Sequence, residues 1–206
     1  MSRSKYINTF NTTAEYDAYI ESAYPEFPNV GYDKQTGNVN VRRQSPNNYQ
    51  IWGTTTATSN FNIKLNGTNV EVTVDPLTGE FYLTGWTGTL TSLSSGFSGL
   101  SHITSIKKFA LDTSSVTSLY STFGACTSLT TLDLSTCDFS NVTSQTSCFY
   151  NAPSLKDVYI TEEATLRKLT NNLASQNTQY IPSTATIHYN GTDYKWQNNA
   201  WTPQNV

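Results

Sequence analysis

The side chains that could do chemistry are few and scattered. The two histidines, His102 and His188, have no nearby partner motif. No serine or cysteine lies in a G-x-S-x-G elbow, and neither an H-E-x-x-H pair nor a phosphate-binding glycine loop occurs. The adjacent acids Glu162 and Glu163 fit the start of a helix, where the helix dipole stabilises negative charge, better than a catalytic pair. These patterns predict a non-enzymatic protein without a metal or cofactor site.

Three cysteines, Cys126, Cys137 and Cys148, lie close together in the sequence. An odd count without C-x-x-C spacing argues against a disulfide framework or a zinc site. We expect Cys137 to be a small, buried structural residue and not a reactive thiol.

The tryptophans leave two alternatives open. They could stack on sugar rings, or they could plug the ends of small modules. We favour plugs, because large aromatic side chains are the usual means of closing a small core. The residues concerned are Trp52, Trp86, Trp196 and Trp201.

Composition excludes several classes of protein. The chain has 206 residues, 13% of them charged, and a net charge of -3. Only isolated basic pairs such as Lys107–Lys108 occur, so we expect no nucleic-acid partner. No apolar run is long enough for a membrane span, and none near the first residue suits a signal peptide. A chain rich in serine, threonine and asparagine is usual among β-rich extracellular or virion proteins. Without an export signal, virion proteins assembled in the host cytoplasm are one class that fits.

A repeat of 26 residues organises the middle of the chain. Phe97, Phe123 and Phe149 align when the sequence is shifted by this period. The period suits leucine-rich repeats of the form L-x-x-L-x-L-x-x-[N/C]-x-L. The central unit fits this form in full, through Leu129, Leu132, Leu134, Cys137 and Phe139. Degenerate outer units are expected, because terminal units cap a stack.

The central unit, "CTSLTTLDLSTCDFSNVTSQTSCFYNAPSL", resembles the BspA-type leucine-rich repeats of Bacteroidales surface proteins and of phages that infect them. This resemblance covers about residues 90–175. The segment "FNTTAEYDAYIES" with the following "NVGY" and "GNV" resembles N-terminal modules in structural proteins of Bacteroides phages, including crAss-like phages. Together these resemblances imply a phage virion structural protein. The alternative is a bacterial BspA-like cell-surface adhesin or interaction module.

The remaining segments complete the predicted fold. A capping box, Thr12 with Glu15, begins a helix that Pro25 ends, and a short hairpin follows. Alternating residues in 61–89 predict a β-meander, and 185–196 predicts another hairpin. We therefore expect an α+β fold, with a leucine-rich-repeat solenoid of about three coils capped by β-hairpins and a small N-terminal helix-hairpin module. The expected domains are 1–50 (docking module), 51–89 (meander cap), 90–180 (repeats) and 181–206 (hairpin cap).

Aromatic residues of the N-terminal module are the predicted assembly site. Aromatic side chains are enriched in the cores of interfaces, so we expect them to pack in a homo-oligomer or to dock on another virion protein, on the capsid, a fibre or the tail. The alternative is that they pack on the following hairpin. The residues are Phe10, Tyr16, Tyr19, Tyr24 and Phe27.

The outward-pointing residues of the repeat strands are the predicted receptor face. Side chains alternate across a strand, so residues between the leucines should form exposed columns. We expect this face to contact a host glycan or protein weakly, and the alternative is an inert spacer surface. Its residues are Lys107, Phe109, Thr131, Asp133, Ser135, Asp157, Tyr159 and Thr161, with Ser105 at the start of the first column.

Overall fold

The computed structural model describes residues 30–32, 39–41, 49–174 and 180–204. The chain divides into two compact units, Met1–Asn48 and Tyr49–Val206. In the first unit, β1 (Val30–Tyr32) pairs antiparallel with β2 (Val39–Val41). The helix expected to begin at the capping box, and the whole predicted assembly site, lie outside the described residues.

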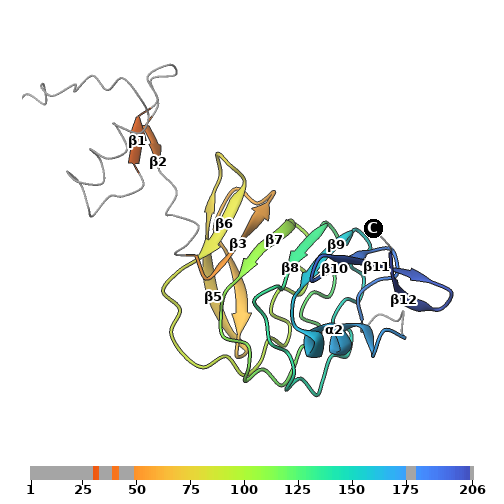
Figure 1. Ribbon diagram of the computed structural model, residues 1–206. Coiled ribbons are helices and arrows are strands. Elements are labelled where there is room, and N and C mark those ends of the chain that lie inside the picture. The colour runs from red at the N-terminus through yellow and green to blue at the C-terminus, as the bar shows by residue number, and fades with distance from the viewer. Residues whose placement is uncertain (1–29, 33–38, 42–48, 175–179, 205–206) are drawn as a thin grey trace, which may run out of the picture. The chain divides into compact units, whose positions relative to one another are not determined.

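One ten-stranded mixed sheet dominates the second unit (Figure 1). Its spatial order is β12-β11-β10-β9-β8-β7-β3-β6-β5-β4. The four central strands from β7 to β10 pair in parallel, and the strands on both sides of them pair antiparallel. The strands are β3 (Ile51–Thr55), β4 (Phe61–Leu65), β5 (Thr68–Asp75), β6 (Glu80–Leu83), β7 (Ile103–Phe109), β8 (Thr131–Asp133), β9 (Asp157–Ile160), β10 (Thr186–Tyr189), β11 (Thr192–Gln197) and β12 (Ala200–Pro203).

The predicted α+β class, with a leucine-rich-repeat solenoid and separate caps, is wrong. The described residues are mainly β, and α2 (Glu163–Thr170) is the one helix among them. The segments expected as caps continue the central sheet, since β3 pairs with β7 and β10 pairs with β9. The physical reason is that the outer repeat strands carry backbone N–H and C=O groups that need partners, and pairing with a further strand supplies them.

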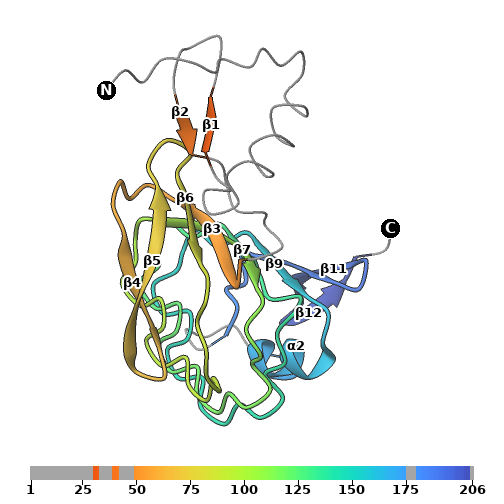
Figure 2. The same ribbon diagram turned by 90° about the vertical axis from the view of Figure 1, so that its left-hand side faces the viewer.

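The register of the central strands confirms the 26-residue spacing. Ser105 pairs with Thr131, which pairs with Asp157. The part of each repeat unit outside its strand, which we call the return segment, also pairs with its neighbours. These segments form a second, parallel ladder through Ser92, Ser118 and Ser144. Both views show these segments as loops on one side of the sheet (Figures 1 and 2). Each unit therefore contributes one strand and one return segment, and each is bonded to its neighbours at both places.

The core lies between the sheet and the return segments. Phe97, Phe123 and Phe149 form a column there, with stacked rings whose centroids are 5.6 Å and 5.5 Å apart. The four repeat residues expected in the core, Leu129, Leu132, Leu134 and Phe139, are fully buried. The column continues without a break into side chains of the meander and the C-terminal hairpin, so the second unit has a single core.

Two backbone positions in the return segment turn with positive φ in every unit. At the first, Ser95, Ser121 and Ser147 have φ of 55°, 51° and 57°. At the second, the residues are Gly99, Ala125 and Asn151, with φ of 75°, 56° and 53°. Alanine is the least suited of these residues, because its Cβ approaches the following carbonyl oxygen and its side chain cannot form a local hydrogen bond.

Replacing Leu132 with alanine should destabilise the second unit by about 2–5 kcal/mol, because the cavity lies at the centre of the stack. Thermal or denaturant unfolding measures this change. Thr131→Ala, at the neighbouring half-buried position of the same strand, is the control and should cost much less. Equal stabilities of the Leu132→Ala protein and the unmodified protein would contradict the stacked core.

Ala125→Gly should stabilise the protein by roughly 1 kcal/mol, because glycine adopts positive φ without the steric cost that alanine bears. Ala110→Gly is the matched control. Ala110 does not have a positive φ, so there the added freedom of the unfolded chain should destabilise by up to about 1 kcal/mol. Both changes are read from the midpoint of denaturant unfolding, and the same sign for both would contradict the assigned backbone conformation.

Candidate functional site

The face of the sheet that points away from the core carries polar and aromatic side chains. In β8 and β9 the outward residues Thr131, Asp133, Asp157 and Tyr159 are half-buried or exposed, while Leu132 and Val158 between them are buried. Register places these residues in rows that continue into β10 and β11. We call this surface the open face, defined by Trp52, Lys107, Thr131, Asp133, Asp157, Tyr159, His188 and Asp193.

His188 is the centre of the most ordered cluster on the open face. Its Nδ1 lies 2.7 Å from Oδ1 of Asp193, the residue opposite it in the β10–β11 hairpin. Its Nε2 lies 3.1 Å from Oδ1 of Asp157 on β9. The ring of Tyr159 stacks on the imidazole with centroids 4.4 Å apart and planes 16° apart. The cluster thus joins the C-terminal hairpin to the last repeat strand.

The two carboxylates favour the doubly protonated, cationic form of His188. Burial alone lowers the pKa of the imidazole, but hydrogen bonds and charge from Asp157 and Asp193 outweigh it. The pKa of His188 is therefore raised above its ordinary value of 6.5. When protonated, each ring nitrogen donates to one carboxylate, so the cluster is a charge-assisted bridge.

Asp133 is held beside this cluster by a local bond. Its Oδ1 accepts a hydrogen bond of 2.9 Å from the backbone N–H of Ser135, an arrangement typical of an Asx-turn. Register places Asp133 next to Tyr159. Of the predicted receptor residues, the structure therefore brings together Asp133, Asp157 and Tyr159.

Lys107 and Trp52 form a second part of the open face. The register of β3 against β7 shifts between Trp52 and Gly53, which pair with Lys108 and Ile106, so Lys107 is the extra residue of a β-bulge. Lys107 is exposed, and its Nζ lies 5.1 Å from the centroid of the Trp52 ring. This distance is suited to a cation–π interaction.

The prediction that Phe109 belongs to the exposed face is wrong. Phe109 is 1% exposed, and its ring packs edge-on against Phe97 with centroids 6.1 Å apart. The cause is the bulge at Lys107, because one extra residue reverses which later side chains point inward. Ser105, expected at the start of the first column, is also buried.

The remaining predicted receptor residues lie at the ends of the strands. Ser135 is half-buried, Thr161 is exposed, and the Thr161 hydroxyl donates to the carbonyl of Ser135. Thr131 lies one row from the histidine cluster, in register with Asp157. These hydroxyls extend the polar surface but do not join the cluster.

The cysteines are structural. All three are buried and free. Burial raises the pKa of the Cys126 and Cys148 thiols to about 12, and it raises the pKa of Cys137 still further. The Cys126 thiol donates to the carbonyl of Phe97 at 3.1 Å. A thiol with a raised pKa is a poor nucleophile, so the expectation for Cys137 is confirmed.

Two of the tryptophans lie in different surroundings, Trp201 in the core and Trp52 on the open face. Trp201 is buried and meets the ring of Trp196 edge-on at 5.8 Å, as expected of a plug. Trp52 lies instead on the open face, where Lys107 covers its ring.

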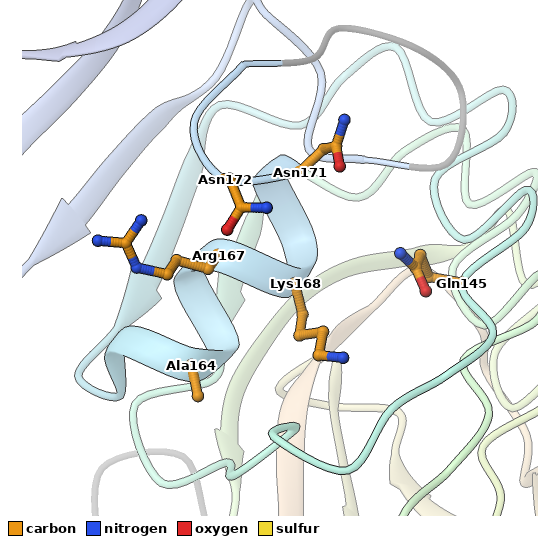
Figure 3. Close-up of a pocket in the computed structure, with 6 residues that line it drawn as sticks. All are labelled: Gln145, Ala164, Arg167, Lys168, Asn171 and Asn172. Carbon is orange, nitrogen blue, oxygen red and sulfur yellow. The ribbon is translucent and has the colours of Figure 1, made fainter.

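A depression lies beside α2 (Figure 3). It has a volume of about 390 Å³ and is lined by Gln145, Ala164, Arg167, Lys168, Asn171 and Asn172. Arg167 points away from Gln145 and pairs with Glu163 at 2.6 Å, and Lys168 donates to the carbonyl of Val142 at 2.7 Å. Both cations that line the depression are therefore bonded to groups of the protein itself.

Within residues 49–174 and 180–204 and the short β1–β2 pair, no group of three histidine, cysteine or acidic side chains could hold a metal ion. No described helix is long and apolar enough to cross a membrane.

The histidine cluster is what sequence reasoning missed. The Asn190–Gly191 turn predicts a two-residue hairpin, and such a hairpin places His188 opposite Asp193. That signal was available in the sequence. The contact with Asp157 was not, because it depends on β10 pairing with β9 in parallel.

His188→Gln should lower stability in a pH-dependent manner. A raised pKa means that the stability contributed by His188 is fully present below pH 6.5 and is lost as the pH rises through the folded-state pKa. The difference in melting temperature between the unmodified protein and this variant should therefore be largest near pH 5.5 and shrink toward pH 8.

His102→Gln is the control with the opposite slope. Burial lowers the pKa of His102, so its protonation destabilises the fold as the pH falls below its ordinary value of 6.5. Its variant should gain stability relative to the unmodified protein at acid pH. A His188→Gln difference that does not change with pH would contradict the bridge.

Comparison with protein families identifies part of the chain. Residues 82–172 match the family described as "Mycoplasma protein of unknown function, DUF285". No curated protein and no solved structure matches the chain significantly. The matched segment runs from β6 through the repeat units to the end of α2. By this match, residues 82–172 form a DUF285 domain of the BspA-like repeat family.

Proposed function

We propose that this protein is a non-enzymatic recognition module that presents its open face to a host-surface glycan or protein, as an accessory fibre or decoration component of a phage virion. The observation that carries the recognition role is the ordered, outward cluster of Tyr159, His188 and their flanking carboxylates on a rigid sheet. The virion setting rests on the resemblance of the N-terminal segment to phage structural proteins.

The chemistry of the open face suits polar ligands. Asp133 and Asp157 offer acceptors for hydroxyl groups, and the Tyr159 ring, 40% exposed, offers an apolar surface between them. Side chains on strands are held more precisely than those on loops, so the ligand does not have to order the site. The unreactive thiols and the salt-bridged histidine support binding in preference to catalysis.

One copy of such a small face should bind weakly. Useful adhesion then needs many copies, which a virion or a cell surface supplies by displaying the chain as an oligomer or an array. In this proposal the N-terminal unit docks on other virion proteins through Phe10, Tyr16, Tyr19, Tyr24 and Phe27.

The second candidate is a bacterial BspA-like surface adhesin, and the DUF285 match, to a family described from Mycoplasma, supports this candidate and not the virion setting. The recognition surface is the same in both. Mass spectrometry of purified virions separates them: detection of the chain at structural stoichiometry supports the virion component, and its presence only in the bacterial envelope supports the adhesin.

Changing Asp133 and Tyr159 together to alanine should weaken binding of multivalent particles to host cells or capsular glycans by about tenfold or more, equivalent to about 1.4 kcal/mol. The matched control is Asp112→Ala with Tyr120→Ala, because these residues are exposed on a return segment and Asp112 accepts from Ser114 as Asp133 does from Ser135. Equal binding by both double variants would place recognition away from the open face.

A further inference from the structure

The backbone ladder of the return segments has a regular donor pattern. In the second repeat unit, four N–H groups donate to carbonyls of the third repeat unit at 2.6–3.0 Å. The donors are Leu119, Ser121, Phe123 and Ala125, and the acceptors are Ser144, Thr146, Cys148 and Tyr150. The first repeat unit makes the same four bonds to the second repeat unit, from Leu93, Ser95, Phe97 and Gly99. Each of these donors therefore meets a carbonyl 25 residues further along the chain.

The third repeat unit has the same backbone N–H groups, but they have no described acceptors. The equivalent N–H groups belong to Gln145, Ser147, Phe149 and Asn151, and among the described residues no group accepts a hydrogen bond from them. Ser147 and Asn151 keep the positive φ of their counterparts, so the backbone still aims its donors as in the bonded units. We call this row, residues 145–151, the donor edge.

The opposite end of the same ladder is closed by the chain itself. The N–H groups of Lys64 and Asn66, in and after β4, donate to the carbonyls of Gly96 and Ser92 at 2.8 Å and 3.0 Å. The Asn66 side chain adds bonds to the backbone of Thr91 and Ser92. Within residues 49–174 and 180–204, the end that carries donors has no such cap.

Helix α2 covers the core beneath the donor edge but not the edge itself. Phe149 is 2% exposed, and Leu166 and Leu169 of α2 are buried in the same core. The depression described above separates α2 from Gln145, with Lys168 extending on the side of Gln145 (Figure 3). The depression therefore borders the donor edge at Gln145.

We infer that the donor edge is a docking site for an extended peptide segment of a different protein, bound by extension of the ladder. The segment lies parallel to residues 144–151 and offers a backbone carbonyl at every second residue, as residues 144–150 do to the unit before them. Addition of a strand-like segment to an open edge is a common mode of peptide recognition, and the pre-ordered donors lower its entropic cost.

A second copy of this chain cannot extend the ladder with either end of its own ladder, because the hydrogen-bonding groups do not match. Two donor edges would set N–H against N–H. At the end that exposes carbonyls in an uncapped stack, the N–H groups of Lys64 and Asn66 already bond the carbonyls of Gly96 and Ser92, so β4 lies where a second copy would have to dock. The partner must instead bring free carbonyl groups, which an extended segment of another protein does.

Amide hydrogen exchange, followed by NMR, tests the inference on the whole protein. The free protein should exchange the amides of Gln145 and Ser147 orders of magnitude faster than those of Leu119 and Ser121, their bonded counterparts. The probe is a synthetic peptide with the sequence of residues 140–152 and Cys148→Ser, since this segment offers the required carbonyls. At ten times its dissociation constant, the peptide should slow exchange at Gln145 and Ser147 about tenfold.

Three controls make the outcome specific. The all-D peptide of the same sequence should give no protection, because its twist is reversed. Ala164→Arg, which fills the depression, should weaken protection by the L-peptide, whereas Asp133→Ala with Tyr159→Ala should leave it unchanged. Slow exchange of Ser147 in the free protein, or no added protection with the L-peptide, would overturn the inference, whatever the open face binds.

Discussion

Each repeat unit depends on its neighbours for backbone hydrogen bonds. A strand of three or four residues and a return segment without regular structure cannot satisfy their own N–H and C=O groups, and burying such groups unpaired costs free energy. The bonds to the units on either side supply the partners at a spacing of one repeat. Side-chain columns then follow, because stacked backbones bring equivalent residues into contact.

The same requirement explains the size of the sheet. The repeat supplies only three parallel strands, and both outer ones need partners. On one side β3 pairs with β7 and brings the meander with it, and on the other β10 pairs with β9 and brings the C-terminal hairpin. The number of strands in the sheet therefore depends on how many flanking segments pair with the repeat strands. Because β10 and β11 continue the repeat strands, the residues of the histidine cluster lie side by side on one surface.

Much of the local structure could be predicted from the sequence. Alternation and Asn–Gly turns indicated the hairpins, and the 26-residue shift indicated which residues lie in contact, such as the three stacked phenylalanines. The fold class could not be predicted, because local patterns do not say which strands pair across the sheet. The buried position of Phe109 could not be predicted either. It depends on the bulge at Lys107, which arises where β7 pairs with a strand that precedes it by about fifty residues. Asp157 was expected on the face, but its histidine partner depends on the same kind of long-range pairing.

The place of β3 in the middle of the sheet also has a consequence for the rate of folding. It is an early strand in the chain of the second unit, yet it lies between β6 and β7, and Thr54 bonds to Ser105, 51 residues away. The meander and the first return segment lie between these two strands and form one long closed loop when they pair. Pairings this distant in sequence slow folding. We therefore expect closure of this seam to be a slow step in folding, and until it occurs the edges of β3 and β7 are open to pairing with other chains.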